Sequence, residues 1–185
     1  MPLPSPPLYT LAYPTLDASD RAFIERFRGE HDLRHRDVAA PHFTLVFGCD
    51  AVPEGTYRAH VAAVAGGTSA IRFSCRYAML GTGDTAGTAH VFLVPDEGFA
   101  ALALLHDRLY RGPLEAYLRL DLPYVPHITV GTLDDRSRAK QLCDALNEDG
   151  VRIDGRIESV CVGALVDGRI RDLVSSPLAA EAPAG

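Results

Sequence analysis

The chain has 185 residues, of which 47% are hydrophobic and 23% are charged, as in a folded globular protein and unlike a disordered chain. A formal net charge of −6 disfavours extensive nonspecific binding to long nucleic acids, which depends on contacts with many phosphates. No apolar stretch is long enough to cross a membrane, and the N-terminus, MPLPSPPLYT, lacks the positive charge and apolar core of a secretory signal.

The first half of the chain alternates between strand and helix patterns. Strands are expected at 8–13, 42–48 and 70–80, and helices at 17–33 and 54–65. The first helix has Asp17 or Ser19 as its N-cap, and its apolar face comprises Phe23, Ile24 and Phe27. The strand at 70–80 alternates strictly, which predicts one shared face for Ile71, Phe73, Cys75, Tyr77 and Met79.

The second half roughly repeats this order and adds a strand. Strands are expected at 89–94, 127–131, 157–166 and 169–176, and helices at 96–112 and 134–150. Asp96 is the expected N-cap of the helix at 96–112, and Gly112 is its expected end. Asp167-Gly168, between the last two strands, is a strong signal for a β-hairpin.

This order of elements predicts an α+β fold in a single domain that spans residues 1–185. The domain would be bilobal, with two pseudo-symmetric, mostly antiparallel sheets flanked by helices. The cysteines form no CxxC pair, and we expect a reduced, cytoplasmic protein that is a monomer; they are Cys49, Cys75, Cys143 and Cys161.

One short motif occurs in both halves, each time on the strand that follows the first helix. The two copies are PHFTL, with His42 and Thr44, and PHITV, with His127 and Thr129, and the histidines lie 127 − 42 = 85 residues apart. Because side chains alternate along a strand, each histidine shares a face with the threonine of its own motif. A pseudo-two-fold axis would bring both polar pairs to one cleft.

Two imidazoles and two hydroxyls suit phosphoryl transfer near neutral pH. A neutral imidazole accepts a proton from the attacking oxygen, while a protonated one donates to the leaving oxygen. Threonine hydroxyls donate to the phosphate oxygens. A lone histidine on a strand is more often structural, but a packing requirement would not select histidine twice. We therefore interpret His42 and His127 as the acid–base pair and Thr44 and Thr129 as phosphate ligands, with no metal and no other cofactor.

The paired motif resembles that of the 2H phosphoesterase superfamily, which is named for two His-x-Thr/Ser-x motifs. The chain is most similar to the bacterial branch labelled 2′-5′ RNA ligase-like. This resemblance implies metal-independent opening of 2′,3′-cyclic phosphates of nucleotides or RNA ends to 2′-phosphates, and in some members the joining of RNA ends. That branch often has Arg two residues before the second His and a basic residue just after the motif. Here Val125, Gly131 and Thr132 occupy these places, which disfavours RNA-end specificity and ligation.

The sequence leaves other functions open. One is a phosphodiesterase for another small phosphoester, such as a cyclic ribose phosphate or a 2′-5′ oligonucleotide. Another is a 2′-5′ RNA ligase, and a third is a nucleotide-binding module without turnover. Further possible substrate contacts are His90 and Phe92, which share one face of a strand, and Tyr124, which lies near His127 in the sequence.

The remaining histidines and basic residues carry weaker signals. His31 and His35 have the i, i+4 spacing of a helical metal site, but no carboxylate or cysteine cluster supports one, and a solvated surface is the expectation. His60 and His106 lie on expected helices, with surface or core roles. A solvated helix face is expected for Arg136, Arg138 and Lys140.

Overall fold

The computed structural model describes residues 5–82 and 87–180. Within these ranges it contains nine strands: β1 Leu8–Ala12, β2 Thr15–Leu16, β3 Phe43–Cys49, β4 Ile71–Thr82, β5 Ala89–Glu97, β6 Ile128–Leu133, β7 Ile153–Ile157, β8 Ser159–Val166 and β9 Arg169–Pro177. The helices are α1 Ala18–His31, α2 Glu54–Gly66, α3 Phe99–Leu109, α4 Arg136–Glu148 and the short 3-10 helix η1 Gly112–Tyr117. None of these helices has the length and apolar character needed to cross a membrane.

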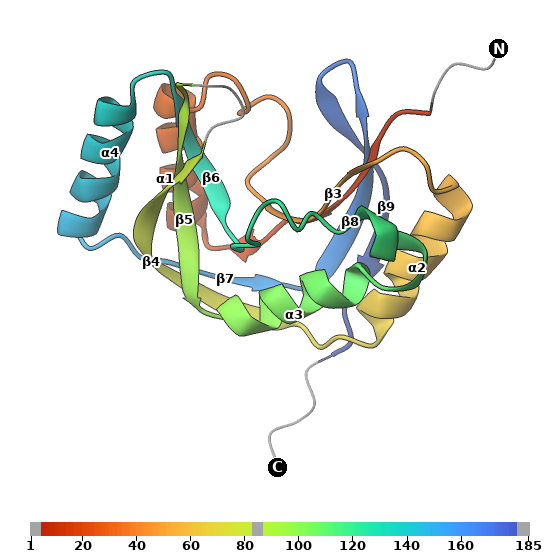
Figure 1. Cartoon of the computed structure of the whole chain (residues 1–185). Coiled ribbons are helices and arrows are strands. Elements are labelled where there is room, and N and C mark those ends of the chain that lie inside the picture. The colour runs from red at the N-terminus through yellow and green to blue at the C-terminus, as the bar shows by residue number, and fades with distance from the viewer. Residues whose placement is uncertain (1–4, 83–86, 181–185) are drawn as a thin grey trace.

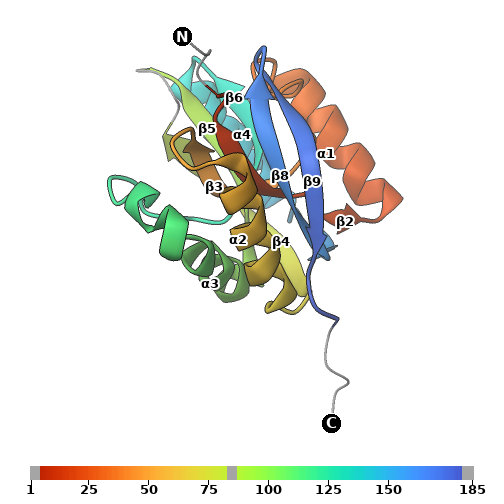
Figure 2. The same ribbon diagram turned by 90° about the vertical axis from the view of Figure 1, so that its right-hand side faces the viewer.

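The strands form a strongly curled antiparallel sheet with helices on its flanks, which confirms the α+β fold class (Figure 1). The strand order is β2-β7-β4-β5-β6-β3-β1-β8-β9. Helix α4 packs against β4, β5 and β6, and α2 packs against β8 and β9. In Figure 2, α2 lies in front of the sheet with α3 beside it, and α1 is seen at the right of the view.

The two predicted sheets are two halves of one sheet that meet at the repeated motifs. Strands β3 and β6, which carry the motifs, are neighbours at the centre and pair through Phe43 and Ile128. The halves of the sheet do not coincide with the halves of the chain, because β8 and β9 join the half that contains β3, while β4 joins the half that contains β6. Each half of the chain thus contributes strands to both halves of the sheet.

Two local predictions were wrong for identifiable reasons. Asp96 does not cap α3, because β5 continues through Glu97 and the Asp96 carboxylate pairs with Arg76 at 3.2 Å. Gly98 takes the N-cap position with φ of +85°, a left-handed conformation that glycine adopts without strain. In β4 a bulge after Cys75 shifts the alternation, so that Ala78 is buried and Tyr77 is exposed.

Other local predictions are confirmed. Asp17 caps α1 by accepting a hydrogen bond from the backbone N–H of Asp20 at 2.8 Å. The hairpin between β8 and β9 turns at Asp167 and Gly168, which have φ angles of 50° and 74°. Positive φ at both central residues is the conformation of a type I′ turn, for which Asp-Gly is a preferred sequence.

Candidate active site

Along both motifs the side chains alternate between the core and the opposite face of the sheet, as predicted. The apolar members are completely or almost completely buried: Phe43, Leu45, Ile128 and Val130. The polar members are half-buried: His42, Thr44, His127 and Thr129. Because the strands are antiparallel with Phe43 opposite Ile128, continuing that register sets His42 opposite Thr129 and Thr44 opposite His127. The register therefore places the four polar residues on one face of the sheet.

The two histidines are oriented in the same way. The Nδ1 atom of His42 lies 2.7 Å from the carbonyl oxygen of Ala40, and the Nδ1 atom of His127 lies 2.6 Å from that of Val125. A carbonyl only accepts, so Nδ1–H is the donor in both cases and the neutral rings are Nδ1–H tautomers. Nε2 is then the nitrogen that exchanges a proton with a ligand, and among the described residues neither Nε2 has a hydrogen-bond partner.

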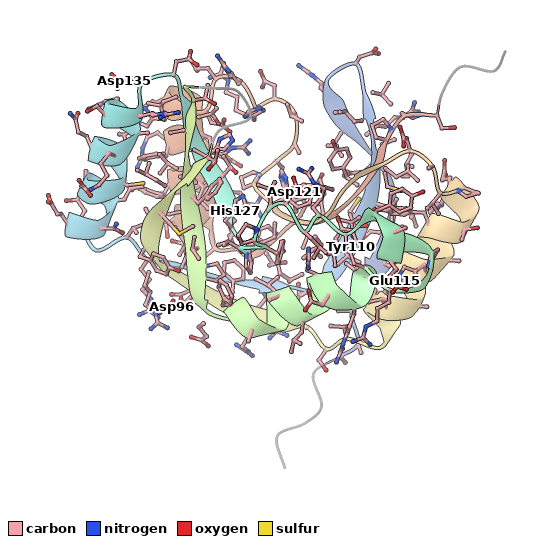
Figure 3. All side chains as sticks on the ribbon, in the orientation of Figure 1. Asp96, Tyr110, Glu115, Asp121, His127 and Asp135 are labelled. Carbon is pink, nitrogen blue, oxygen red and sulfur yellow. The ribbon has the colours of Figure 1, made fainter. Side chains whose placement is uncertain are left out.

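Both imidazoles have pKa values below the usual value for histidine. Burial is the main cause for His127, whose pKa is lowered to about 4, and the charges of His42 and His90 lower it further while the bond to Val125 opposes the shift. Burial also lowers the pKa of His42, against the bond to Ala40. Among the charges that act on His42, Arg28 lowers its pKa, while Asp32 and Asp172 raise it. Figure 3 shows His127 at the start of β6, in the middle of the molecule.

Phe92 lies against the ring of His127. The two rings are stacked, with centroids 3.6 Å apart, and His90 stacks at 5.5 Å from Phe92. The Phe92 ring also covers Gly81, where a Cβ atom would lie only 1.9 Å from it. The structure thus brings both strand residues predicted as possible substrate contacts, His90 and Phe92, next to His127. Their contact with a substrate remains a prediction.

A β-bulge adds Thr132 and His35 to this neighbourhood. Thr129 pairs with Phe92 and Gly131 pairs with Val91, which leaves Val130 as an extra residue. The bulge turns Thr132 to the face of Thr129, although the two are three residues apart. The Thr132 hydroxyl lies 3.0 Å from Nδ1 of His90 and 3.1 Å from Nδ1 of His35. His35, expected on a solvated surface, keeps a side chain that is 36% exposed, but it also has this contact with Thr132, which only the bulge would have revealed.

Next to His35, a buried ion pair holds the segment that leads to His42. Arg28 donates from Nε to Asp32 at 3.2 Å, and its two terminal nitrogens donate to the carbonyl oxygens of His35 and Ala39, each at 3.1 Å. The side chains of Arg28 and Asp32 are 6% and 0% exposed. Because Ala39 precedes the carbonyl that orients His42, the ion pair supports the position of that imidazole.

Replacing Arg28 by Met is expected to lower the free energy of unfolding by about 3–5 kcal/mol, because it removes the hydrogen-bonded partner of the buried Asp32 carboxylate and leaves only His35, whose Nδ1 lies 3.5 Å from Oδ1. Urea denaturation checks this value. The double variant Arg28→Met/Asp32→Leu is the control, and it should regain much of the loss because no unpaired charge remains. A loss below about 1 kcal/mol in the single variant would contradict this account of the pair.

Three other sequence candidates are placed as follows. Tyr124 is largely buried, and its hydroxyl donates to the carbonyl oxygen of Thr44 at 3.1 Å. His60 binds the carbonyl oxygen of Leu109 at 2.8 Å, and His106 is buried in α3. Sequence reasoning missed Tyr13, whose ring lies 6.1 Å from that of His42 and whose hydroxyl donates to Asp172 at 3.0 Å.

Two pockets lie away from the two motifs, and no metal-ligand group is found in the described ranges. Two pockets, of about 270 and 370 Å³, are both lined by Arg72 and contain no residue of the two motifs. Residues 5–82 and 87–180 contain no group of three or more His, Cys, Asp or Glu side chains arranged to hold a metal.

Comparison with known proteins connects this geometry to a family. The crystal structure of Escherichia coli LigT in its apo form is similar with a TM-score of 0.55 and 20% sequence identity, over 94% of this chain and 98% of that one. Kluyveromyces marxianus Usb1 is similar with a TM-score of 0.57 and 10% identity, over 96% of this chain and 100% of that one. Curated protein sequences gave no match.

These structural likenesses establish the fold. The sequence evidence is independent of them, because the profile of the 2′-5′ RNA ligase superfamily matches residues 16–169, a range that includes both His-x-Thr motifs. The chain therefore belongs to the 2′-5′ RNA ligase superfamily of 2H phosphoesterases.

Proposed function

We propose that this protein is a metal-independent phosphodiesterase that opens 2′,3′-cyclic phosphates of nucleotides or RNA ends to 2′-phosphates. The observation that carries the proposal is the matched orientation of the two histidines. Each imidazole donates from Nδ1 to the carbonyl oxygen two residues earlier, which leaves Nε2 of both rings for proton transfer. Two imidazoles in the same tautomer, each just before one of two neighbouring strands, can act as a base and an acid in one reaction.

The reaction proceeds by addition of water to the cyclic phosphate. The neutral imidazole accepts a proton from the attacking water at Nε2 as the new P–O bond forms. The other imidazole, protonated, gives its Nε2 proton to O3′ as the P–O3′ bond breaks, and a 2′-phosphate remains. The hydroxyls of Thr44 and Thr129 donate to the non-bridging oxygens, where negative charge is concentrated in the transition state.

The lowered pKa values fit an anionic substrate. In the free protein, burial opposes protonation of both rings, and the charge of His42 opposes it further at His127. A phosphate anion between the rings raises both pKa values, because it stabilises the charged imidazolium. The substrate therefore promotes the protonated state that the acid must have.

The ligands of the similar structures support a nucleotide substrate. Escherichia coli LigT was crystallised with 3′-AMP and with phosphate, and Kluyveromyces marxianus Usb1 was crystallised with uridine monophosphate. A nucleotide with a cyclic phosphate combines a nucleoside and a phosphate group in one substrate.

A panel of substrates in the presence of EDTA tests the proposal. It contains 2′,3′-cyclic nucleotides, short RNAs that end in a cyclic phosphate, cyclic ribose phosphates and 2′-5′ dinucleotides, with products identified by mass spectrometry. We expect 2′-phosphate products at a rate that EDTA does not change, because both proton transfers are assigned to imidazoles.

The control for this panel is the double variant His42→Ala/His127→Ala, which separates the protein's own activity from contaminating nucleases. Loss of activity on chelation, with recovery on adding a divalent cation, would argue against the two-histidine mechanism. Products from 2′-5′ dinucleotides or cyclic ribose phosphates alone would assign the site to a different phosphoester. Tight nucleotide binding without product would favour a binding module.

A further inference from the structure

The two motif strands are joined by very little backbone pairing. The register between β3 and β6 contains one pair, Phe43 opposite Ile128. On the N-terminal side of this pair, residues 123–127 are not part of a strand, and Pro126 has no N–H group to donate to a neighbouring strand. A side chain makes a second connection at this point, because the hydroxyl of Tyr124 donates to the carbonyl oxygen of Thr44 at 3.1 Å.

The protein holds Tyr124 firmly in the orientation that makes this bond. Its ring stacks on the imidazole of His106 in α3, with the centroids 3.6 Å apart and the planes inclined by 14°. Burial raises the pKa of Tyr124, so its hydroxyl stays protonated and remains a donor. Burial lowers the pKa of His106, against the effect of Asp107, and thus favours the neutral ring in this stack.

The bond connects the two halves of the candidate active site. Tyr124 immediately precedes Val125, whose carbonyl oxygen accepts the hydrogen bond from Nδ1 of His127. Thr44, whose carbonyl oxygen the hydroxyl contacts, is the threonine of the other motif. We propose that Tyr124 is a positioning residue, which fixes the Val125 carbonyl and therefore the tautomer and orientation of His127 relative to Thr44. The effect on turnover rests on the function proposed above, whereas the effect on His127 does not.

Replacing Tyr124 by Phe tests this inference, because the substitution keeps the stacked ring and removes only the hydroxyl. The matched control is Tyr110→Phe. The Tyr110 hydroxyl accepts a hydrogen bond from the backbone N–H of Phe47 at 3.0 Å, and its ring also contacts His106, with centroids 4.9 Å apart. The control therefore removes a hydroxyl that also contacts β3, but at Phe47, outside both motifs.

The first measurement needs no substrate. Nitrogen-15 NMR of the imidazoles, at a pH where His127 is neutral, distinguishes the Nδ1–H tautomer from the Nε2–H tautomer. We expect His127 to be the Nδ1–H tautomer in the wild type and in Tyr110→Phe, and to acquire an Nε2–H population in Tyr124→Phe. His42 should keep the Nδ1–H tautomer in all three proteins, because Ala40 orients it independently.

The second measurement is turnover of the best substrate in the panel. Tyr124→Phe is expected to lower kcat about tenfold with less than about a twofold change in KM, because a small misplacement of a proton-transfer group slows the chemical step. Tyr110→Phe should keep kcat within about twofold of the wild type.

The two measurements separate this inference from the proposed function. An unchanged His127 tautomer in Tyr124→Phe, or an equal change in Tyr110→Phe, would overturn the inference. A tautomer change confined to Tyr124→Phe, in a protein that turns over no phosphoester, would support the positioning role and refute the proposed reaction.

Discussion

His42→Ala and His127→Ala are each expected to lower kcat by about 10²–10⁴-fold, the usual contribution of a proton transfer from a positioned side chain. Both imidazoles present Nε2 to a ligand in the same way, so neither substitution should be tolerated. Because the two histidines act in one tightly linked event, the double variant should lose less than the product of the two single losses. Steady-state kinetics with the cyclic nucleotide identified by the panel measures all three values.

The dependence of the rate on pH distinguishes the two roles. The base must be neutral, so the rate rises with pH through its pKa; the acid must be protonated, so the rate falls as pH passes its pKa. Since the pKa of His127 is lowered to about 4 and that of His42 is also lowered, the optimum of kcat/KM should lie on the acidic side of 6.5. The optimum of kcat should lie at higher pH, because the bound phosphate raises both pKa values.

Each single histidine variant should lose one limb of the bell-shaped profile. The limb that disappears identifies the residue as base or acid. Circular dichroism at each pH serves as the control for unfolding. A wild-type profile that is flat from about pH 5 to pH 9, or near-normal turnover by His42→Ala, is incompatible with this mechanism.

The repeated motif was sufficient to predict which four polar residues share one face of the sheet. Its alternation depends only on the two-residue period of a strand, and the observed burial of Phe43 and Ile128 follows that period. The partition between core and polar face was therefore available from the sequence. So was the fold class, because the order of helices and strands is a local property.

Features that depend on tertiary contacts were not predictable in the same way. The bulge at Val130 changes the phase of one strand, and it alone brings Thr132 to the face of Thr129. Strand β7 was missed because Asp154 and Gly155 are both poor strand residues. The exchange of outer strands between the two halves of the sheet leaves no mark on hydrophobic periodicity.

The i, i+4 spacing of Arg28 and Asp32 is visible in the sequence, but it is equally typical of an exposed helical pair. Only the structure shows that this pair is buried and that Arg28 also binds the carbonyl oxygens of the segment before His42. All of these groups lie within residues 28–39, but their burial depends on how this segment packs against the rest of the fold, which no local pattern encodes.

Thr44→Val and Thr129→Val are each expected to lower kcat by up to about 10²–10³-fold. Valine has nearly the shape of threonine, so the strand keeps its packing while one hydrogen-bond donor is lost. That donor acts on the non-bridging phosphate oxygens, whose charge is stabilised more in the transition state than in the substrate, and the loss should therefore fall on kcat more than on KM. Steady-state kinetics on the same cyclic nucleotide separates the two constants.

The matched controls are Thr44→Ser and Thr129→Ser, which keep the hydroxyl and remove only a methyl group. They should retain most of the wild-type kcat. Continuing the register from Phe43 and Ile128 sets Thr129 opposite His42 and Thr44 opposite His127, so both hydroxyls share the face of the imidazoles, and both valine variants should be impaired. Equal losses in the serine and valine variants would show that the hydroxyls contribute through packing. Near-normal kcat in both valine variants would remove the threonines from the proposed mechanism and leave the phosphate to the two imidazoles alone.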